Sequence, residues 1–451
     1  MGPEDDRVAA LVGRSLGGAA VDVHRLPGGA SRTTSAFDLE TDGERRSLIL
    51  QVDRGAATGL AASVQVEAAL LRAAATVGVP VPAVVGSGTL DDGRGWLVVE
   101  RVAGETIPRR ILREESLEDA RRALAAQCGV ALAAIHRIDP ATVEGLPPRD
   151  PLHQPLDLLD GVGAVRPVLE LGVRWLSRTP VASSERVTVH GDFRLGNLLV
   201  GTEGLRAVLD WELAHAGDPA EDLGWLCARA WRFGAPKHVG GFGELETLLD
   251  AYEAAGGERI SAERLSFWEA AAAVRWAVIC ALQASTHLHG VVRSVELAAI
   301  GRRVCESEWD LLLGLGVAAP IRTPPSTWWS EAPSRAPFGD PSAAALVEAV
   351  RGYLEQRMLD ERDPRQRFDA RVARNALAIV GRELAGGDAI ATAHAARLSS
   401  LGFTDDPALA AALRCGRLDG FLGEVGAVLA ESTRDQLLVA NPSYLLDATA
   451  P

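Results

Sequence analysis

Short runs of apolar and β-branched residues dominate the first hundred positions and predict a small β-sheet. Residues 35–40 and 48–52 are expected to form two of its strands. Asp42 and Gly43 lie between these runs, and this dipeptide is a strong signal for a tight hairpin turn. Residues 96–102 are expected to form a further strand. The chain is therefore predicted to begin with a mixed region whose strands pair locally.

One amphipathic helix is expected within this region. Residues 60–76 place Glu67 and Leu71 along one side at helical spacing, and Gly78 suits the C-terminal cap of that helix. Residues 79–82 alternate valine with proline. They must be extended, because proline cannot continue a helix.

Helical spacing dominates residues 103–319, apart from residues 187–211, where short apolar strands surround a polar loop. Residues 320–340 are rich in proline, which excludes regular structure and indicates a linker. Trp328 and Trp329 lie inside this linker. Because adjacent tryptophans rarely remain solvated, we expect the linker to lie against a domain surface.

Composition limits the partners and the compartment. The chain has 451 residues, which is too long for one hydrophobic core, so two or three domains are expected. Its net charge of -14 argues against nucleic acid and anionic membranes as partners. The five cysteines form no C-x-x-C pair, which argues against disulfides and zinc and favours the reducing cytoplasm.

No leader or membrane span is expected. Residues 1–6 are acidic and lack an apolar stretch, and Asp6 stands where a myristoylation signal has Ser or Thr. The most apolar helix, over residues 268–284, carries Glu269 and Arg275. We interpret it as a buried helix that is too short and too charged to cross a bilayer.

One segment in the middle of the chain gathers residues suited to catalysis. Residues 198–200 and 205–209 are apolar strands, and a hairpin there brings Asn197 and Asp210 together at its open end. An amide oxygen facing a carboxylate suits Mg²⁺ with bound phosphates and waters. Asp192, on the same loop, is placed to accept a proton from an attacking hydroxyl.

This set matches the needs of phosphoryl transfer, which depends on positioning and charge neutralisation. The spacing from His-Gly-Asp at 190–192 to Asn197 matches the catalytic loop of kinases. Together with Asp-Trp-Glu at 210–212, it resembles the aminoglycoside phosphotransferase family, which includes choline kinase-like and homoserine kinase-like enzymes. The resemblance extends over residues 15–315.

The resemblance implies an α+β, bilobal fold like that of protein kinases. A small β-rich N-lobe would occupy residues 1–102, and a larger helical C-lobe with the catalytic loop residues 103–319. The linker over residues 320–340 and an all-α domain over residues 341–451 would follow. The implied activity is that of a cytoplasmic kinase, a transferase that uses ATP and magnesium to phosphorylate a hydroxyl of a small-molecule substrate.

The resemblance also implies roles for individual residues. Asp192 would be the catalytic base, and His190 would order its loop. Asn197 and Asp210 would hold magnesium. The strand that ends at Glu100, Arg101 and Val102 would be the hinge whose backbone binds adenine.

Further residues would complete the nucleotide site. Gly28, Gly29 and Ser31 would lie over the phosphates, where small residues let backbone N–H groups approach anions. The glycine pair alone predicts only a turn, because it lacks the full glycine-rich pattern.

The chain departs from the family on its third strand, where a Lys or Arg usually faces the phosphates and pairs with a helical glutamate. Glu67 is the glutamate candidate, but Gln51 occupies the strand position, and the only lysine is Lys237. Arg46 or Arg54 would substitute if the strand shifts. A weak kinase, displaced chemistry and a nucleotide-binding pseudokinase all remain open.

Four nearby residues are expected to be structural. His136 is interpreted as a cap or core histidine. Asp218 and Asp222 are expected to cap or brace a helix, and Glu212 to be structural. None of these four residues is therefore expected to be catalytic, and the catalytic role is assigned to the loop over residues 190–197.

More than one interpretation remains open for the phosphate acceptor and for the tail, residues 341–451. The segment 208–213 resembles the kinase-like domain of some acyl-CoA dehydrogenase family members, and this resemblance implies a hydroxyacyl thioester as the phosphate acceptor. The acidic composition instead suits a cationic acceptor, such as an amino alcohol or an aminoglycoside. The tail resembles a bacterial helical domain of unknown function. It is predicted to carry two helices with apolar stripes, over residues 346–358 and 368–384.

The second tail helix also has a polar side. Its charged and amide side chains are Arg371, Arg374, Asn375 and Arg382. They form either a face that is simply solvated, or a surface that acts as a lid or contacts a partner. Three functions therefore stay open: an active phosphotransferase, a nucleotide-binding regulatory module, and a scaffold that acts through the tail. The oligomeric state is open as well.

Overall fold

The computed structural model describes residues 9–10, 12–26, 32–53, 62–181, 186–323, 325–329, 343–358 and 363–446. The chain forms two compact units. The first comprises Met1–Arg149 and Ala182–Trp268, and the second comprises Asp150–Val181 and Glu269–Pro451.

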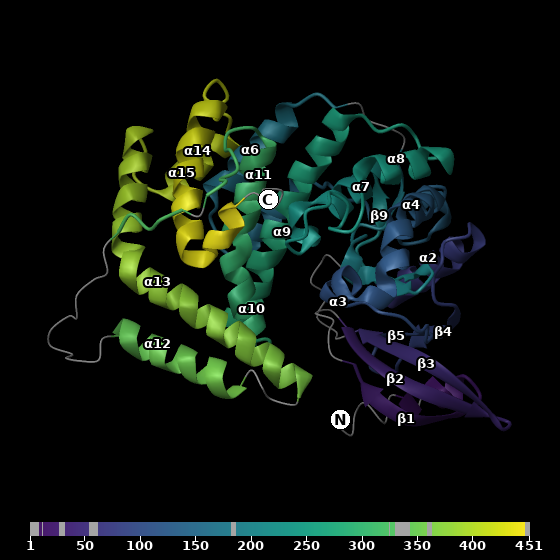
Figure 1. Ribbon diagram of the computed structural model, residues 1–451. Helices are drawn as coiled ribbons and strands as arrows, with labels where there is room; N and C mark the ends of the chain where they lie inside the picture. The colour runs from purple at the N-terminus through teal and green to yellow at the C-terminus, as the bar shows by residue number, and fades with distance from the viewer. Residues whose placement is uncertain are drawn as a thin grey trace. The chain divides into compact units, whose positions relative to one another are not determined.

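The first unit contains a five-stranded antiparallel sheet in the order β1-β2-β3-β5-β4 (Figure 1). Its strands are β1 (Ala19–Arg25), β2 (Arg32–Thr41), β3 (Glu44–Asp53), β4 (Val84–Thr89) and β5 (Gly95–Glu100). Asp42 and Gly43 make the tight turn between β2 and β3, as predicted, and both have positive φ angles.

Strand β4 was missing from the sequence-based expectation. Its sequence contains Gly86 and Gly88, which weaken a strand pattern. Both glycines lie against the ring of Trp96 on β5, and a Cβ at Gly88 would come within 2.8 Å of that ring. The glycines are therefore explained by a packing partner that the local sequence does not show.

The two faces of this sheet are covered differently. Ala9 and Val12 pack on one face, in a core that includes Leu50 and Val52 of β3. Helix α2 (Val64–Thr76) contacts β3, β4 and β5 on the other face. Because side chains alternate along a strand, Gln51 belongs to the α2 face.

The rest of the first unit holds the segment that the sequence suggests is catalytic. Its helices are α3 (Pro108–Arg113), α4 (Glu118–Ile135), α7 (Pro219–Cys227) and α8 (Leu245–Ala254). It also has two two-stranded antiparallel sheets: β6 (Val187–Val189) pairs with β9 (His215–Gly217), and β7 (Leu198–Gly201) forms a hairpin with β8 (Gly204–Val208). Helices α4 and α8 approach closely at Gly129, where a Cβ would lie 2.5 Å from the carbonyl oxygen of Leu248. This contact fixes the helices that carry His136 and Tyr252.

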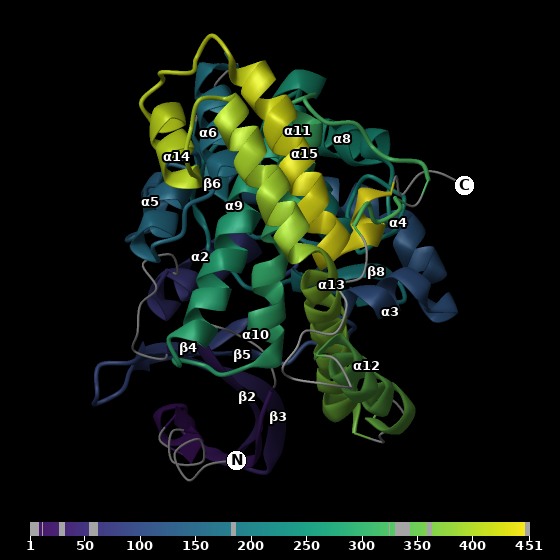
Figure 2. The same ribbon diagram turned by 90° about the vertical axis from the view of Figure 1, so that its left-hand side faces the viewer.

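The second unit is helical. Its helices are α5 (Gln154–Gly161), α6 (Pro167–Arg178), α10 (Val295–Ile300), α11 (Val304–Gly314), α12 (Ala343–Tyr353), α13 (Pro364–Ser400), α14 (Asp406–Arg414) and α15 (Leu422–Ala440). Figure 2 shows α13 beside α15, and α15 also contacts α6 and α11. Arg414 of α14 pairs with both Asp160 and Glu170, which ties the tail to α5 and α6.

The described part of the linker lies against helices of the same unit, as predicted. The indole N–H of Trp328 donates a hydrogen bond of 3.0 Å to Asp435 on α15. The ring of Trp329 lies where a side chain at Gly386 of α13 would stand, 2.3 Å from that Cβ position. The linker therefore shares the packing of the tail.

The polar side of α13 is not uniformly solvated. Arg382 donates hydrogen bonds to the carbonyl oxygens of Val439 at 2.6 Å and Ala440 at 3.2 Å. These carbonyls end α15 and lack partners within their own helix, so Arg382 caps that helix. Arg374 instead pairs with Glu355 at 3.4 Å near the surface.

The apolar helix noted in the sequence is longer than predicted. Helix α9 (Ala262–Leu288) has 27 residues, so the expectation that it is too short to span a bilayer is wrong. Among the described residues it is the one helix with the length and composition to cross a membrane, and 56% of its most apolar stretch is buried. A core helix meets the same criteria.

Candidate active site

The hairpin of β7 and β8 sets the geometry of the candidate site. Leu198 pairs with Val208, and the backbone N–H of Leu209 donates to the carbonyl oxygen of Asn197 at 2.9 Å. Asn197 and Asp210 therefore stand at the open end of the hairpin, as its strand pattern predicts. Asp210 has a φ of 63°, a left-handed conformation that is uncommon outside glycine and concentrates at functional sites.

The Asp192 carboxylate is held by three donors. Its Oδ1 accepts hydrogen bonds from Arg194 Nε and Trp225 Nε1, both at 2.9 Å. Its Oδ2 accepts from Asn197 Nδ2 at 2.6 Å, and the same amide nitrogen donates to the Asp192 carbonyl oxygen at 3.0 Å. Because the amide nitrogen of Asn197 faces Asp192, its oxygen remains available as an acceptor.

His190 fixes the backbone of this loop. Its ring is fully buried, and burial lowers the pKa of the imidazole, which favours the neutral form. Nε2 donates to the carbonyl oxygen of Leu209 at 3.1 Å, so Nδ1 can accept the backbone N–H of Asp192 at 3.1 Å. The neutral ring thus connects the loop to the strand that leads to Asp210.

Asp222 of α7 braces the same loop. Its carboxylate accepts the backbone N–H groups of His190 at 2.7 Å and Gly191 at 2.8 Å, and the Nε2–H of His136 at 3.3 Å. Burial raises the pKa of Asp222, but these hydrogen bonds outweigh burial and leave the pKa below its usual value. Asp222 therefore has the structural role that was expected: it does not cap α7, but through His136 it braces the end of α4, and it also holds the loop, which was not predicted.

Its neighbours have the structural roles expected of them. His136 is a core histidine whose Nδ1 lies 2.8 Å from the Tyr252 hydroxyl. Asp218 caps α7 by accepting the backbone N–H of Ala220 at 2.8 Å, and it pairs with Arg264 at 2.5 Å. These contacts hold the helix that presents Asp222.

Negative charge accumulates around Asp210. Burial raises the pKa of Asp210 to about 7, and the charges of Glu212 and Asp192 add to this effect. The guanidinium groups of Arg194 and Arg32 oppose it but do not cancel it. Carboxylate and amide oxygens with surplus negative charge are the donor set that Mg²⁺ prefers, so these residues fit a magnesium ion.

Arg32 and Arg194 are two residues that the sequence interpretation missed. Arg32 begins β2 and forms an ion pair with Glu67 of α2, and both side chains are buried. Arg194 also lies over the ring of Trp231, 4.6 Å from its centroid. Arg194 lies in the predicted loop, two residues after Asp192, but no pattern there gives the arginine a role, and Arg32 precedes the predicted strand over residues 35–40.

The remaining predicted site residues lie on β3, on the surface, at the end of β5, or outside the described residues. Gln51 lies on β3, whereas Arg46 points to the surface and pairs with Glu100 at 3.0 Å. The backbone N–H of Glu100 donates to Ala83 at 2.9 Å, and Val102 follows β5. Four other predicted residues lie outside the described residues; they are Gly28, Gly29, Ser31 and Arg54.

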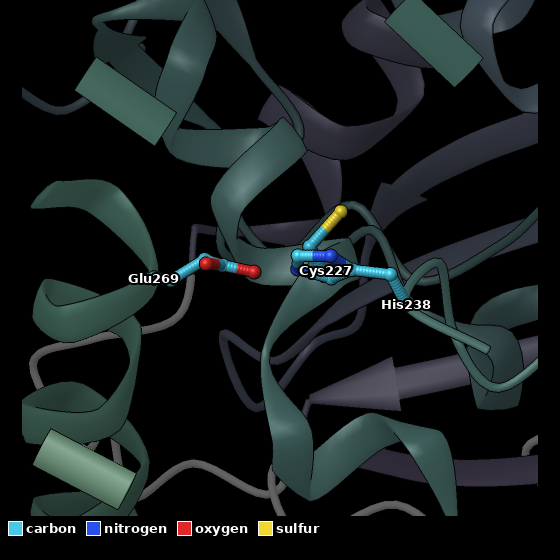
Figure 3. Close-up of side chains that lie close together, drawn as sticks. All are labelled: Cys227, His238 and Glu269. Atoms are coloured by element: carbon cyan, nitrogen blue, oxygen red, sulfur yellow. The ribbon is translucent and has the colours of Figure 1, made fainter. Parts of the chain in front are cut away.

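Figure 3 shows three further side chains of types that can bind metals, those of Cys227, His238 and Glu269. Cys227 is buried at the end of α7, and its carbonyl oxygen accepts two hydrogen bonds from Arg232, at 2.8 and 3.0 Å. Cys227 and His238 belong to the first unit, and Glu269 begins the second. The three residues are therefore not assigned as one site.

Curated relatives match only a short stretch. Acyl-CoA dehydrogenase family member 10 of Mus musculus is 41% identical over 63 residues, which are 14% of this chain and 6% of the relative. Acyl-CoA dehydrogenase family member 11 of Rattus norvegicus is 41% identical over 63 residues, which are 13% of this chain and 8% of the relative. The match therefore spans less than a tenth of each relative.

Solved structures resemble a larger part of the chain. A protein from Ralstonia eutropha assigned to the aminoglycoside phosphotransferases has 21% identity and a TM-score of 0.52, with coverage of 67% of this chain and 94% of that one. A spectinomycin phosphotransferase has 12% identity and a TM-score of 0.48, with coverage of 67% and 97%. The first likeness concerns the fold and confirms the predicted kinase-like α+β architecture.

Family models match two parts of the chain. A domain of unknown function, DUF6285, matches residues 360–444, as the resemblance of the tail predicted. The model of a phosphotransferase enzyme family matches residues 22–268, which is more than half of the chain and includes the sheet, the loop of Asp192 and the hairpin that ends at Asp210. Together with the fold, this match shows that the chain belongs to the phosphotransferase enzyme family.

Proposed function

We propose that this protein transfers the γ-phosphate of ATP to a hydroxyl group of a small molecule. The observation that carries the proposal is the convergence of Asp192, Asn197 and Asp210 at the open end of one hairpin, with more negative than positive charge around Asp210. A nucleotide phosphate needs a divalent cation between itself and such carboxylates. The family and the fold give this arrangement its chemical context.

Asp192 has the role of positioning and deprotonating the acceptor hydroxyl. Its hydrogen bonds from Arg194, Trp225 and Asn197 fix the carboxylate in one orientation, which lowers the entropic cost of aligning the hydroxyl. His190 and the residues that brace it keep this loop in place rather than react.

Asn197 and Asp210 would hold Mg²⁺, which when bound neutralises the charge of the phosphates. In this proposal Gly28, Gly29 and Ser31 lie over the phosphates, and the chain around Glu100 and Val102 binds adenine. The protein would act in the cytoplasm on a small molecule, and neither nucleic acid nor membrane would be a partner.

For the acceptor, we infer a hydroxyacyl thioester. What supports this choice is the 63-residue match to acyl-CoA dehydrogenase family members 10 and 11, whose names connect them with acyl-CoA chemistry. An amino alcohol or an aminoglycoside is the competing acceptor class.

A nucleotide-binding pseudokinase is the second candidate function. The observation that favours it is Gln51, a neutral side chain on β3 where the family offers a cation. Such a protein would bind ATP without turnover and act as a regulatory or interaction module. The contacts of its helical tail would then carry the signal.

ATP consumption with Mg²⁺ tests the proposal. The full-length protein should consume ATP with at least one member of a panel of hydroxylated metabolites that includes hydroxyacyl-CoAs, amino alcohols and aminoglycosides. Asp192→Asn and Asp210→Ala should abolish this turnover, whereas Asp91→Asn, an exposed turn position, should retain it. ATP binding without turnover across the whole panel would instead support the pseudokinase.

A further inference from the structure

Strand β3 presents a neutral side chain, Gln51, on the sheet face that α2 covers. The family usually places a cation there, and a glutamate on the following helix holds it. Glu67 is that glutamate, and its side chain is buried. Because a buried carboxylate needs a cation or hydrogen-bond donors, the residue that pairs with Glu67 is the candidate for the cation that β3 lacks.

We propose that Arg32 of β2 replaces the missing β3 cation and contacts the phosphates of the bound nucleotide. The inference rests on the proposed ATP-dependent function and names a nucleotide-binding residue for it. Arg32 forms an ion pair with Glu67, and only 3% of Arg32 and 2% of Glu67 are exposed.

The strand register explains how Arg32 reaches this position. Thr34 lies directly opposite Gln51 across the β2–β3 pair, and Arg32 lies opposite Asp53. Since side chains alternate along a strand, Arg32 and Gln51 share one face of the sheet. Such diagonal positions are about 7–8 Å apart, within reach of a long side chain. The cation thus comes from the adjacent strand, yet it meets the same helix.

The guanidinium group has a donor left for a ligand. Arg32 Nη2 donates to the carbonyl oxygen of Ala62 at 2.9 Å. Nε is buried and donates no hydrogen bond within the described part of the chain. It lies 3.5 Å from a carboxylate oxygen of Asp53 and 4.0 Å from one of Glu212. A phosphate oxygen would satisfy this donor.

Arg32 is also connected to the segment that carries Asp210. Glu67 Oε1 accepts the backbone N–H of Trp211 at 3.4 Å, and the backbone N–H of Ala62 donates to the carbonyl oxygen of Glu212 at 2.7 Å. The partners of Arg32 are therefore bonded to the two residues that follow Asp210. This arrangement fixes the position of Arg32 relative to Asp210, the candidate metal ligand. A fixed position is needed if both side chains are to act on one bound triphosphate.

Calorimetric binding of MgATP, MgADP and adenosine to the full-length protein tests this inference. Arg32→Gln should weaken ATP and ADP binding roughly ten- to a hundredfold, the usual effect of losing a charged hydrogen bond. It should leave adenosine binding unchanged. The matched control is Arg45→Gln on β3, an arginine that pairs with Asp38 on the surface, and it should bind all three ligands like the wild type.

Two double variants separate phosphate binding from a structural role. Arg32→Gln/Gln51→Lys returns the cation to β3 and should recover most of the ATP affinity. Arg32→Gln/Glu67→Gln removes both buried charges, so it should fold, and its ATP binding should stay weak. Recovery of ATP affinity in this second variant would mean that Arg32 only neutralises Glu67.

The wild type separates this inference from the proposed function. If the wild type binds ATP and Arg32→Gln binds it equally well, the role of Arg32 is refuted and the function stands. If the wild type binds no ATP, the proposed function fails with it. Should Arg32→Gln alone not fold, the two double variants decide the outcome.

Discussion

Asp222→Asn tests how the candidate catalytic loop is held in place. The carboxylate is fully buried and accepts the backbone N–H groups of His190 and Gly191 together with the ring N–H of His136. An asparagine has nearly the same shape, but its amide nitrogen cannot accept a hydrogen bond. One buried N–H group loses its acceptor, and the charge that strengthens the other bonds is lost.

The expected cost follows from these bonds. An unsatisfied buried donor costs about 1–3 kcal/mol, and hydrogen bonds to a charged group contribute about 1.5–3 kcal/mol. Because the two effects overlap, we expect Asp222→Asn to lower the free energy of opening of this region by about 2–4 kcal/mol. Hydrogen exchange of peptides from residues 186–227, corrected for intrinsic rates, measures that quantity without requiring the whole chain to unfold.

The pH dependence adds a second test. The pKa of Asp222 is lowered in the folded protein, so its ionised form stabilises the fold above the unfolded pKa of about 3.9. That stabilisation disappears as the pH falls through the folded pKa. The difference between wild type and Asp222→Asn should therefore be full at pH 7 and shrink below about pH 4.

Two results would refute this reasoning. A loss smaller than about 0.5 kcal/mol, the range of ordinary surface substitutions, would show that Asp222 does not brace the loop. A difference that stays constant from pH 7 to pH 3 would show that its charge is not involved. Asp91→Asn, at an exposed turn, is the control and should match the wild type throughout.

Three further substitutions test other contacts. Trp225→Phe keeps the aromatic ring but removes an N–H donor to Asp192, so steady-state kinetics should show turnover reduced about tenfold with ATP affinity unchanged; equal turnover would contradict this. Gly129→Val forces α4 away from α8 and should cost about 1–3 kcal/mol in urea unfolding; an unchanged midpoint would contradict the close contact. Arg382→Met removes the cap of α15 and should speed hydrogen exchange of its last turn; unchanged protection would exclude that role.

Local patterns predicted the features that depend on neighbouring residues. The turn at Asp42 and Gly43 follows from a dipeptide that adopts positive φ angles easily, and the hairpin after Asn197 follows from two apolar strands around a glycine-containing turn. The spacing of the catalytic loop is local as well. For this reason the loop and the hairpin could be read before the fold was known.

Contacts between distant segments could not be predicted in this way. Arg32 meets Glu67 only because β2 begins three residues earlier than its apolar pattern indicates, which brings the arginine into the sheet. Asp222 reaches the backbone of His190 across 32 positions of sequence. Strand β4 was not predicted, because its glycines lower the strand propensity of the segment. The same glycines make room for the ring of Trp96. Each of these features depends on a tertiary partner.

In the proposed enzyme, Asp192, Asn197 and Asp210 form one site for a metal ion and a nucleotide triphosphate. Calorimetry of ATP binding with Mg²⁺ and with EDTA, on the wild type and on Asp210→Asn, tests it most directly. Asparagine tolerates the left-handed conformation at this position, so the variant should keep the backbone of the site. ATP binding should require Mg²⁺ and should be lost in Asp210→Asn. Equal ATP binding in EDTA, or in the variant, would show that these side chains do not bind a metal–nucleotide complex.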